Sequence, residues 1–169
     1  WFRDQWGRTE MDGAERTGAD VYDLLLRSME SEPTELLVLP YFTPSGTPYF
    51  DAKTPGAILG LRMSTTRGQV LRALLEGIAL EMRLNVDILE DAGLNVREFR
   101  AIGGGAKNPA LTQLKADVLG RPITTLASDK SQDDRGWYLS LHRSFDNLKT
   151  LRRKIEDNLI SEMIAVAES

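Results

Sequence analysis

The sequence predicts an α/β fold, and three observations support this prediction. Apolar side chains recur at helical spacing over residues 66–92, which predicts a long amphipathic helix. The apolar run at residues 35–42 is typical of a short strand. Residues 96–102 and 121–126 read as two further strands, and residues 109–120 between them read as a helix. Strand, helix and strand in this order form a βαβ unit, whose strands normally lie parallel.

Composition narrows the classes of protein to which the chain can belong. Its 169 residues, 41% hydrophobic and 27% charged, allow one ordinary domain with a core. A formal charge of −4 gives no basic surface for nucleic acid. Without cysteine, and with His142 as its one histidine, the chain can hold neither a disulfide nor a multi-histidine metal site. No apolar run reaches the roughly 20 residues of a membrane span, so we expect no membrane partner and a cytoplasmic location.

The first 61 residues contain a helical part, a strand and a loop. Residues 1–31 read as helical, and residues 35–42 form a strand that Pro40 ends. Residues 43–61 carry three prolines and three glycines, which predicts a long ordered loop. Because the chain opens inside a helix at Trp1, we expect it to be cut from a longer protein. The apolar stripe of the helical part is Val21, Leu24, Leu25, Leu26 and Met29.

The long helix has recognisable signals at both ends. Thr65 or Thr66 suits the N-cap, and Gly93 suits the position just beyond the last turn. Gly77 lies in the middle, where glycine costs about 1 kcal/mol relative to alanine. We therefore expect a neighbouring element to approach Gly77 closely. The predicted buried face consists of Leu71, Leu74, Leu75, Ile78, Met82, Val86 and Leu89.

The helix of the βαβ unit is delimited in the same way. Asn108 suits the N-cap, Pro109 the first turn and Gly120 the end. Its predicted buried face consists of Leu111, Leu114, Val118 and Leu119.

The character of the sequence changes after residue 126. Residues 127–140 are polar and turn-rich and read as a linker, whereas residues 141–169 read as a helical tail. The apolar stripe of the tail fits either a core face or a surface that pairs with another chain, which leaves a homo-oligomer possible. This stripe is Leu148, Leu151, Ile155, Leu159, Met163 and Val166.

The segment Gly103-Gly104-Gly105-Ala106-Lys107-Asn108 joins a predicted strand to a predicted helix. Glycines there allow a backbone to approach phosphate or ribose, and a helix N-terminus favours an anion. The segment matches neither GxxxxGK[ST] nor GxGxxG. A tight turn that needs positive φ explains the glycines equally well, so the segment alone leaves both interpretations open.

Other candidates for chemistry are weaker. Glu76 with Glu81, or Asp87 with Glu90, could pair as carboxylates, but the spacing of Asp87 and Glu90 is that of a solvated helix face. Neither Ser45 nor Ser64 has a base nearby in the sequence. No residue is identified as a catalytic nucleophile or general base, and none as a metal ligand.

Three longer motifs carry more information together than separately. LPYFTPSGTPYFDAKTPGAILGL, TTRGQVLRALLEGIALEMR and FRAIGGGAKNPALTQLKADVLGRPI follow one another over residues 39–123. In this order they resemble the C-terminal domain of FGGY-type carbohydrate kinases, especially the xylulokinase-like members. The resemblance covers residues 1–126, which would be a partial nucleotide-binding domain.

The resemblance implies a ribonuclease-H-like, actin-like ATPase fold of two domains with a cleft between them. ATP would lie in the cleft with Mg²⁺, and its γ-phosphoryl group would pass to a sugar or polyol hydroxyl. Gly103, Gly104 and Gly105 would pack against the phosphates and ribose of the nucleotide, and Asn108 would lie beside the adenosine. Ala106 and Lys107 would complete this cofactor-binding segment.

The sequence also departs from the family. The N-terminal domain with the sugar site and the general base is not in this chain, and ASDKSQDDRGWYLSL replaces the family's next helix. We therefore expect a sugar kinase of which this chain supplies part of the nucleotide-binding domain and is inactive alone. The alternative is a catalytically inactive interaction or oligomerisation module with a helical tail.

Overall fold

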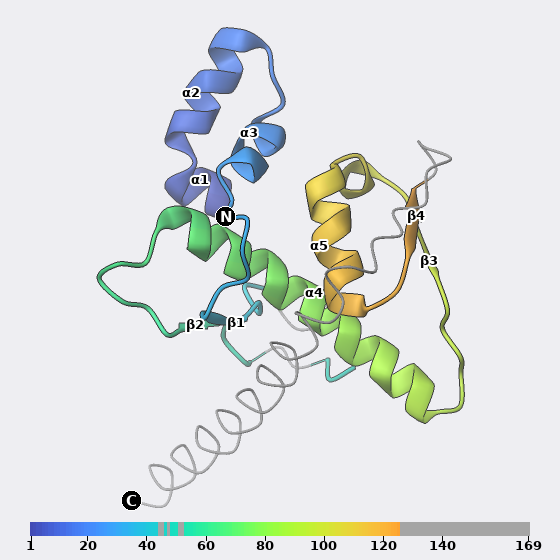
Figure 1. Ribbon diagram of the computed structural model, residues 1–169. Helices are drawn as coiled ribbons and strands as arrows, with labels where there is room; N and C mark the ends of the chain where they lie inside the picture. The colour runs from blue at the N-terminus through green and yellow to red at the C-terminus, as the bar shows by residue number, and fades with distance from the viewer. Residues whose placement is uncertain (44–45, 47, 51–52, 126–169) are drawn as a thin grey trace, which may run out of the picture. The chain divides into compact units, whose positions relative to one another are not determined.

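The computed structural model describes residues 1–43, 46, 48–50 and 53–125 (Figure 1). The chain divides into two units between Asp133 and Asp134, and every described residue belongs to the first. The predicted linker at 127–140 and the predicted tail at 141–169 lie outside the described residues and stay predictions.

The helical start of the chain is confirmed, but it forms separate helices. These are α1 (Phe2–Trp6), α2 (Arg8–Thr17) and α3 (Val21–Arg27). A Cβ on Gly7, between α1 and α2, would lie 2.6 Å from the carbonyl oxygen of Arg3, so only glycine fits there. Gly18 ends α2 with φ of 71°. Asp20 then caps α3, its Oδ1 accepting from the backbone N–H of Tyr22 at 2.7 Å.

The strand predicted at residues 35–42 is present as β1 (Leu37–Leu39). It pairs antiparallel with β2 (Ala57–Leu59), with Leu37 opposite Leu59. The prediction of an uninterrupted loop over residues 43–61 is therefore wrong at β2. The three apolar residues of β2 lie between Gly56 and Gly60 and are too few to show the alternation of a strand. They form a strand because β1 offers backbone groups with which they can pair.

The long helix is confirmed as α4 (Arg67–Asp91). Thr66, rather than Thr65, is its N-cap and forms a capping box with Gln69. The close approach expected at Gly77 is also present, because a Cβ there would lie 2.8 Å from the carbonyl oxygen of Val38. Gly93 follows the helix with φ of 88°, as its predicted position requires.

The core lies along α4 in three clusters. Near its start, Val70 and Leu74 pack with Leu36 and Val38 of the β1 region. Further along, Ala79 packs with Leu114 and Val118, and Val86 packs with Ala116, Leu119 and Ile123. Successive parts of one helix thus cover two different neighbours, both of which Figure 1 shows beside α4.

The predicted buried face of α4 is wrong at three positions. Ile78, Met82 and Leu89 are 45%, 37% and 43% exposed. The sequence period marks a continuous apolar stripe, but β1 and α5 bury only the parts of it that they contact.

The predicted βαβ unit is confirmed. It consists of β3 (Phe99–Ala101), α5 (Pro109–Leu119) and β4 (Ile123–Thr125), and its strands are parallel with Phe99 opposite Ile123. Both strands are shorter than residues 96–102 and 121–126. Asn108 caps α5 and Gly120 ends it with φ of 64°. The turn from β3 into α5 contains a short 3-10 helix, η1 (Gly104–Ala106).

Candidate functional site

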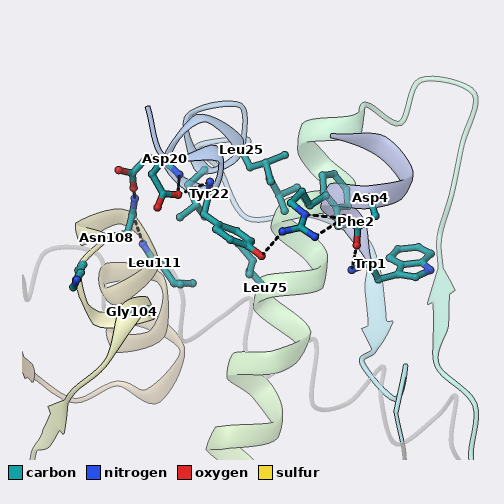
Figure 2. A pocket seen from close by; sticks show the side chains of 16 residues that line it. Trp1, Phe2, Asp4, Asp20, Tyr22, Leu25, Leu75, Gly104, Asn108 and Leu111 are labelled. Atoms are coloured by element: carbon teal, nitrogen blue, oxygen red, sulfur yellow. Dashed lines mark hydrogen bonds and ion pairs between the residues drawn. The ribbon is translucent and has the colours of Figure 1, made fainter. Parts of the chain in front are cut away.

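A pocket of about 640 Å³ lies where the glycine segment faces α1, α3 and α4 (Figure 2). Four of the six predicted site residues line it, namely Gly104, Gly105, Lys107 and Asn108. Gly103 and Ala106 belong to the same turn but not to the lining, and the role of all six residues toward a ligand stays a prediction. The other lining residues are Trp1, Phe2, Arg3, Asp4, Asp20, Tyr22, Asp23, Leu25, Leu26, Leu71, Leu75 and Leu111.

The three consecutive glycines differ in what the fold requires of them. Gly103 has φ of 88° and ψ of −172°, a conformation that favours glycine. Gly104 and Gly105 are not among the glycines with positive φ. A Cβ on Gly104 would meet nothing within 4 Å, and one on Gly105 would only touch Leu111 at 3.8 Å and Lys115 at 3.9 Å. The turn explains Gly103, whereas neither backbone conformation nor packing among the described residues explains the other two.

The backbone amides of the segment fall into two groups, those that donate within the turn and those that do not. The N–H of Ala106 donates to the Gly103 carbonyl at 3.2 Å, and that of Lys107 donates to the Gly104 carbonyl at 3.2 Å. Within the part of the chain that the structure describes, the amides of Gly104 and Gly105 donate to no group. Two uncommitted donors without side chains therefore border the pocket, as a bound anion or hydroxyl would need.

Asn108 connects two walls of the pocket. Its Oδ1 accepts from the backbone N–H of Leu111 at 3.2 Å, which caps α5. Its Nδ2 donates to Oδ1 of Asp23 on α3 at 2.8 Å. The side chain is thus held in one orientation at the pocket edge, beside the exposed Lys107.

The wall opposite the glycine segment comes from α1 and α3, and the sequence did not indicate it. Arg3 Nη1 donates to the hydroxyl of Tyr22 at 3.2 Å, and Arg3 Nε donates to Asp4 Oδ1 at 2.7 Å. The hydrogen bond to Asp4 raises the pKa of Arg3 and, with the Arg3 charge, lowers the pKa of Asp4. The one local signal was the Asp20 cap, which predicts where α3 begins but not what it faces.

Leucines supply the apolar part of the lining. Leu25 and Leu71 are buried, and Leu26, Leu75 and Leu111 are half-buried. Apolar surface of this kind beside a few polar groups suits a ligand with a flat apolar body and a charged end.

The carboxylates Asp87 and Glu90 have structural partners. Arg83 Nε donates to Asp87 Oδ1 at 2.6 Å, and Arg121 forms an ion pair with Glu90. Both carboxylates are only partly exposed, so the prediction of a solvated helix face is wrong. Arginines from one turn away and from beyond α5 cover them.

Glu76 and Glu81 are likewise occupied. Glu76 is buried, with Oε1 accepting from Arg72 at 2.7 Å and Oε2 from the Thr34 hydroxyl at 3.1 Å. Glu81 accepts from the Tyr41 hydroxyl at 3.0 Å. Each carboxylate joins its helix to another residue, and none of them lines the pocket.

The described residues contain neither a metal-ligating cluster nor a helix that could span a membrane. No group of three or more histidine, cysteine, aspartate or glutamate side chains there is placed to hold a metal ion. None of the helices in that part of the chain has the length and hydropathy needed to span a bilayer.

Comparison with solved structures defines the class of fold. Xylulose kinase from Rhodospirillum rubrum aligns with a TM-score of 0.63 and 24% identity, covering 85% of this chain and 36% of the other. Plasmodium falciparum glycerol kinase with ADP aligns with a TM-score of 0.57 and 21% identity, covering 92% and 35%. The fold is therefore that of the actin-like ATPases, and the described residues form an incomplete domain of it.

Sequence comparison then identifies the family. Residues 1–132 match the C-terminal domain of the FGGY family of carbohydrate kinases. Glycerol kinase from Lactococcus lactis subsp. lactis (strain IL1403) is 36% identical over 120 residues, which are 70% of this chain and 24% of the relative. The chain belongs to the FGGY family of carbohydrate kinases, and it spans about a quarter of the length of that relative.

Proposed function

We propose that this chain supplies part of the nucleotide-binding domain of a kinase that transfers a phosphoryl group from ATP to a sugar or polyol hydroxyl. One observation carries the proposal. Gly104 and Gly105 border the pocket with uncommitted amides, although nothing in the described fold requires glycine at either position. A ligand that approaches the backbone closely accounts for both.

The chemistry of the pocket supports a nucleotide. Leucines offer apolar surface for a base, and the glycine amides with Lys107 offer donors and a positive charge for phosphates. A relative with the same fold, the Plasmodium falciparum glycerol kinase, was solved with ADP. In this chain, Gly104 and Gly105 would orient the phosphate end, and Asn108 would hold the pocket wall beside the adenosine.

Mg²⁺ belongs to the proposal as the counterion of the phosphates. It neutralises phosphate oxygens in phosphoryl transfer. Mg²⁺ in such sites is usually held by phosphates, waters and one or two carboxylates, so it does not require a larger cluster of metal-ligating side chains, and the described residues contain none.

The catalytic residues and the sugar contacts are assigned to the rest of the kinase. Glu76, Glu81, Asp87 and Glu90 on α4 are engaged in structural contacts. In the pocket lining Asp4 binds Arg3, Asp20 caps α3 and Asp23 accepts from Asn108, and none of the three is identified as a general base. We therefore expect the isolated chain to show no sugar-dependent ATP hydrolysis. Turnover by the purified 169-residue chain would contradict this assignment.

Titration of ATP–Mg²⁺ against the chain tests nucleotide binding. Trp1 lines the pocket, so tryptophan fluorescence should respond, and the melting temperature should rise with saturation. Gly105→Val should abolish both effects, because its side chain would occupy the space above the backbone. Gly13→Ala is the matched control, since a Cβ there would make an ordinary 3.5 Å contact with Leu24, away from the pocket. No saturable response in the unsubstituted chain would refute the proposal.

The alternative of an inactive interaction module receives no support from the described residues or from the relatives, whose names are those of kinases. Self-association through residues 141–169 stays a prediction, because those residues lie outside the described structure.

A further inference from the structure

Tyr22 lies in the pocket lining, on the wall opposite the glycine segment. The Asp20 cap places it in the first turn of α3, from which its side chain reaches into the pocket. Figure 2 shows the ring between the side that carries Gly104 and Leu111 and the side that carries Phe2 and Asp4. Tyr22 is 55% exposed, which leaves much of this aromatic surface uncovered.

Arg3 holds this ring from another helix. Its guanidinium donates to the Tyr22 hydroxyl at 3.2 Å, and its Cζ lies 5.7 Å from the ring centroid. Asp4 in turn binds Arg3 at 2.7 Å, so the guanidinium is itself fixed. Because the backbone of Tyr22 is held by Asp20 and its hydroxyl by Arg3, the ring is positioned at both ends.

The other aromatic rings of the lining are engaged with each other. Trp1 stacks on Phe42 at 5.0 Å between centroids and meets Trp6 edge-on at 5.2 Å. Phe2 also meets Trp6 edge-on at 5.2 Å. Tyr22 has no ring contact among the described residues, and its aromatic partner is the Arg3 cation. Trp1 is also exposed, at 53%, but one face of its ring stacks on Phe42, whereas no ring covers Tyr22 among the described residues.

A solvent-exposed tyrosine needs no explanation in general. Tyr49 is an example, 63% exposed and outside the pocket. Tyr22 differs because it combines exposure with an anchored hydroxyl, a position in the lining and leucine neighbours such as Leu75. Aromatic rings held in this way are suitable surfaces for stacking a flat base.

We propose that Tyr22, positioned by Arg3, is the platform on which the nucleobase of the bound nucleotide stacks. This inference rests on the proposed nucleotide-binding function and adds a binding residue and a positioning residue to it. Tyr22 contacts the base, whereas Arg3 acts through Tyr22 by fixing the orientation of the ring.

The test uses the full 169-residue chain and 2-aminopurine riboside 5′-triphosphate with Mg²⁺, because stacking quenches the fluorescence of this base. The unsubstituted chain should quench the probe saturably. Tyr22→Leu should remove the quenching and raise Kd about 10-fold, as expected for a lost stack. Tyr22→Phe keeps the ring and the Arg3 cation over it but loses the hydroxyl that Arg3 holds, so it should quench partially. Arg3→Met should give partial quenching, because the ring remains without its anchor.

Two controls separate the platform from its surroundings. Tyr49→Leu removes an exposed tyrosine outside the pocket and should change neither quenching nor Kd. Trp1→Leu removes the other exposed ring of the lining and tests whether that ring, rather than Tyr22, quenches the probe. Quenching that disappears in Trp1→Leu but persists in Tyr22→Leu would overturn the proposal.

The outcomes distinguish this inference from the proposed function. If ATP–Mg²⁺ does not bind the unsubstituted chain, the proposed function is refuted and the stacking platform is refuted with it. If the nucleotide binds and Tyr22→Leu quenches normally, the function stands and the platform is refuted. Should Tyr22→Leu not fold, nuclear Overhauser effects between the base protons and the Tyr22 ring in the unsubstituted chain decide the matter, and their absence would refute stacking.

Discussion

The side-chain amide of Asn108 donates to Oδ1 of Asp23 at 2.8 Å, which joins the first turn of α5 to α3 across 85 residues of chain. The same side chain caps α5 through Leu111. A residue identified for its place beside a glycine turn therefore also holds two pocket walls together.

This relationship predicts the effect of exchanging the two side chains. Asn108→Asp keeps a capping oxygen but sets a second carboxylate against Asp23, so we expect weaker ATP binding by calorimetry with the helix cap retained. Asn108→Ala should lose the cap as well and reduce the free energy of unfolding by about 1 kcal/mol.

The double variant Asn108→Asp with Asp23→Asn restores one amide and one carboxylate in reversed positions. It should recover most of the binding lost in Asn108→Asp alone. If the loss of ATP-binding free energy in the double variant equals the sum of the losses in the two single variants, the hydrogen bond does not organise the pocket.

The glycine segment predicts opposite phenotypes for neighbouring substitutions. Gly104→Ala should change the free energy of unfolding by less than about 0.5 kcal/mol, because its Cβ meets nothing, yet weaken ATP binding. Gly103→Ala forces alanine to φ of 88° and should cost about 1–3 kcal/mol in urea unfolding. Equal destabilisation of both variants would mean that packing explains Gly104 after all.

Gly77→Ala should destabilise the domain although alanine favours helices. The added methyl would lie 2.8 Å from the Val38 carbonyl oxygen and push β1 away from α4. We expect a loss of about 1–3 kcal/mol, as for other overpacked sites. A variant with a higher melting temperature would show that β1 can move away at little cost.

The ion pair between Glu10 on α2 and Arg67 at the start of α4 predicts an acid-sensitive contact. The Arg67 guanidinium donates to Glu10 Oε2 at 2.8 Å and lowers the pKa of that carboxyl below its ordinary value of 4.5. A lowered folded-state pKa contributes stability that is present above 4.5 and lost as pH falls through the folded value.

Glu10→Gln removes this titration. Between about pH 5 and pH 3 its free energy of unfolding should fall less steeply than that of the unsubstituted chain. Near pH 7 the variant should be less stable, as measured by urea unfolding. Parallel pH profiles of the two proteins would contradict a stabilising role for the pair.

Features that depend on nearby residues were predictable from the sequence. The cap at Asn108 and the helix end at Gly120 rest on hydrogen bonds and dihedral angles within a few residues. For α4 the sequence narrowed the N-cap to Thr65 or Thr66, and the order of consecutive elements predicted the βαβ unit. The glycine segment alone fitted either a tight turn or a ligand contact. Only the resemblance carried by the three longer motifs favoured a nucleotide.

Tertiary structure decided what those local elements face. Strand β2 exists because β1 offers it an edge, and α4 is buried where other segments cover it, including β1, α5 and residues 30–34. No spacing in the sequence brings Tyr22 and Arg3 opposite Gly104, because contacts between distant segments depend on how whole elements pack. By itself the sequence determined the two longest helices, the signals at their ends and the family, since these follow from local chemistry and ordered motifs. The pocket wall of α1 and α3 was decided by contacts between distant segments, such as Phe2 against the α4 cluster and Asn108 with Asp23, which no local pattern encodes.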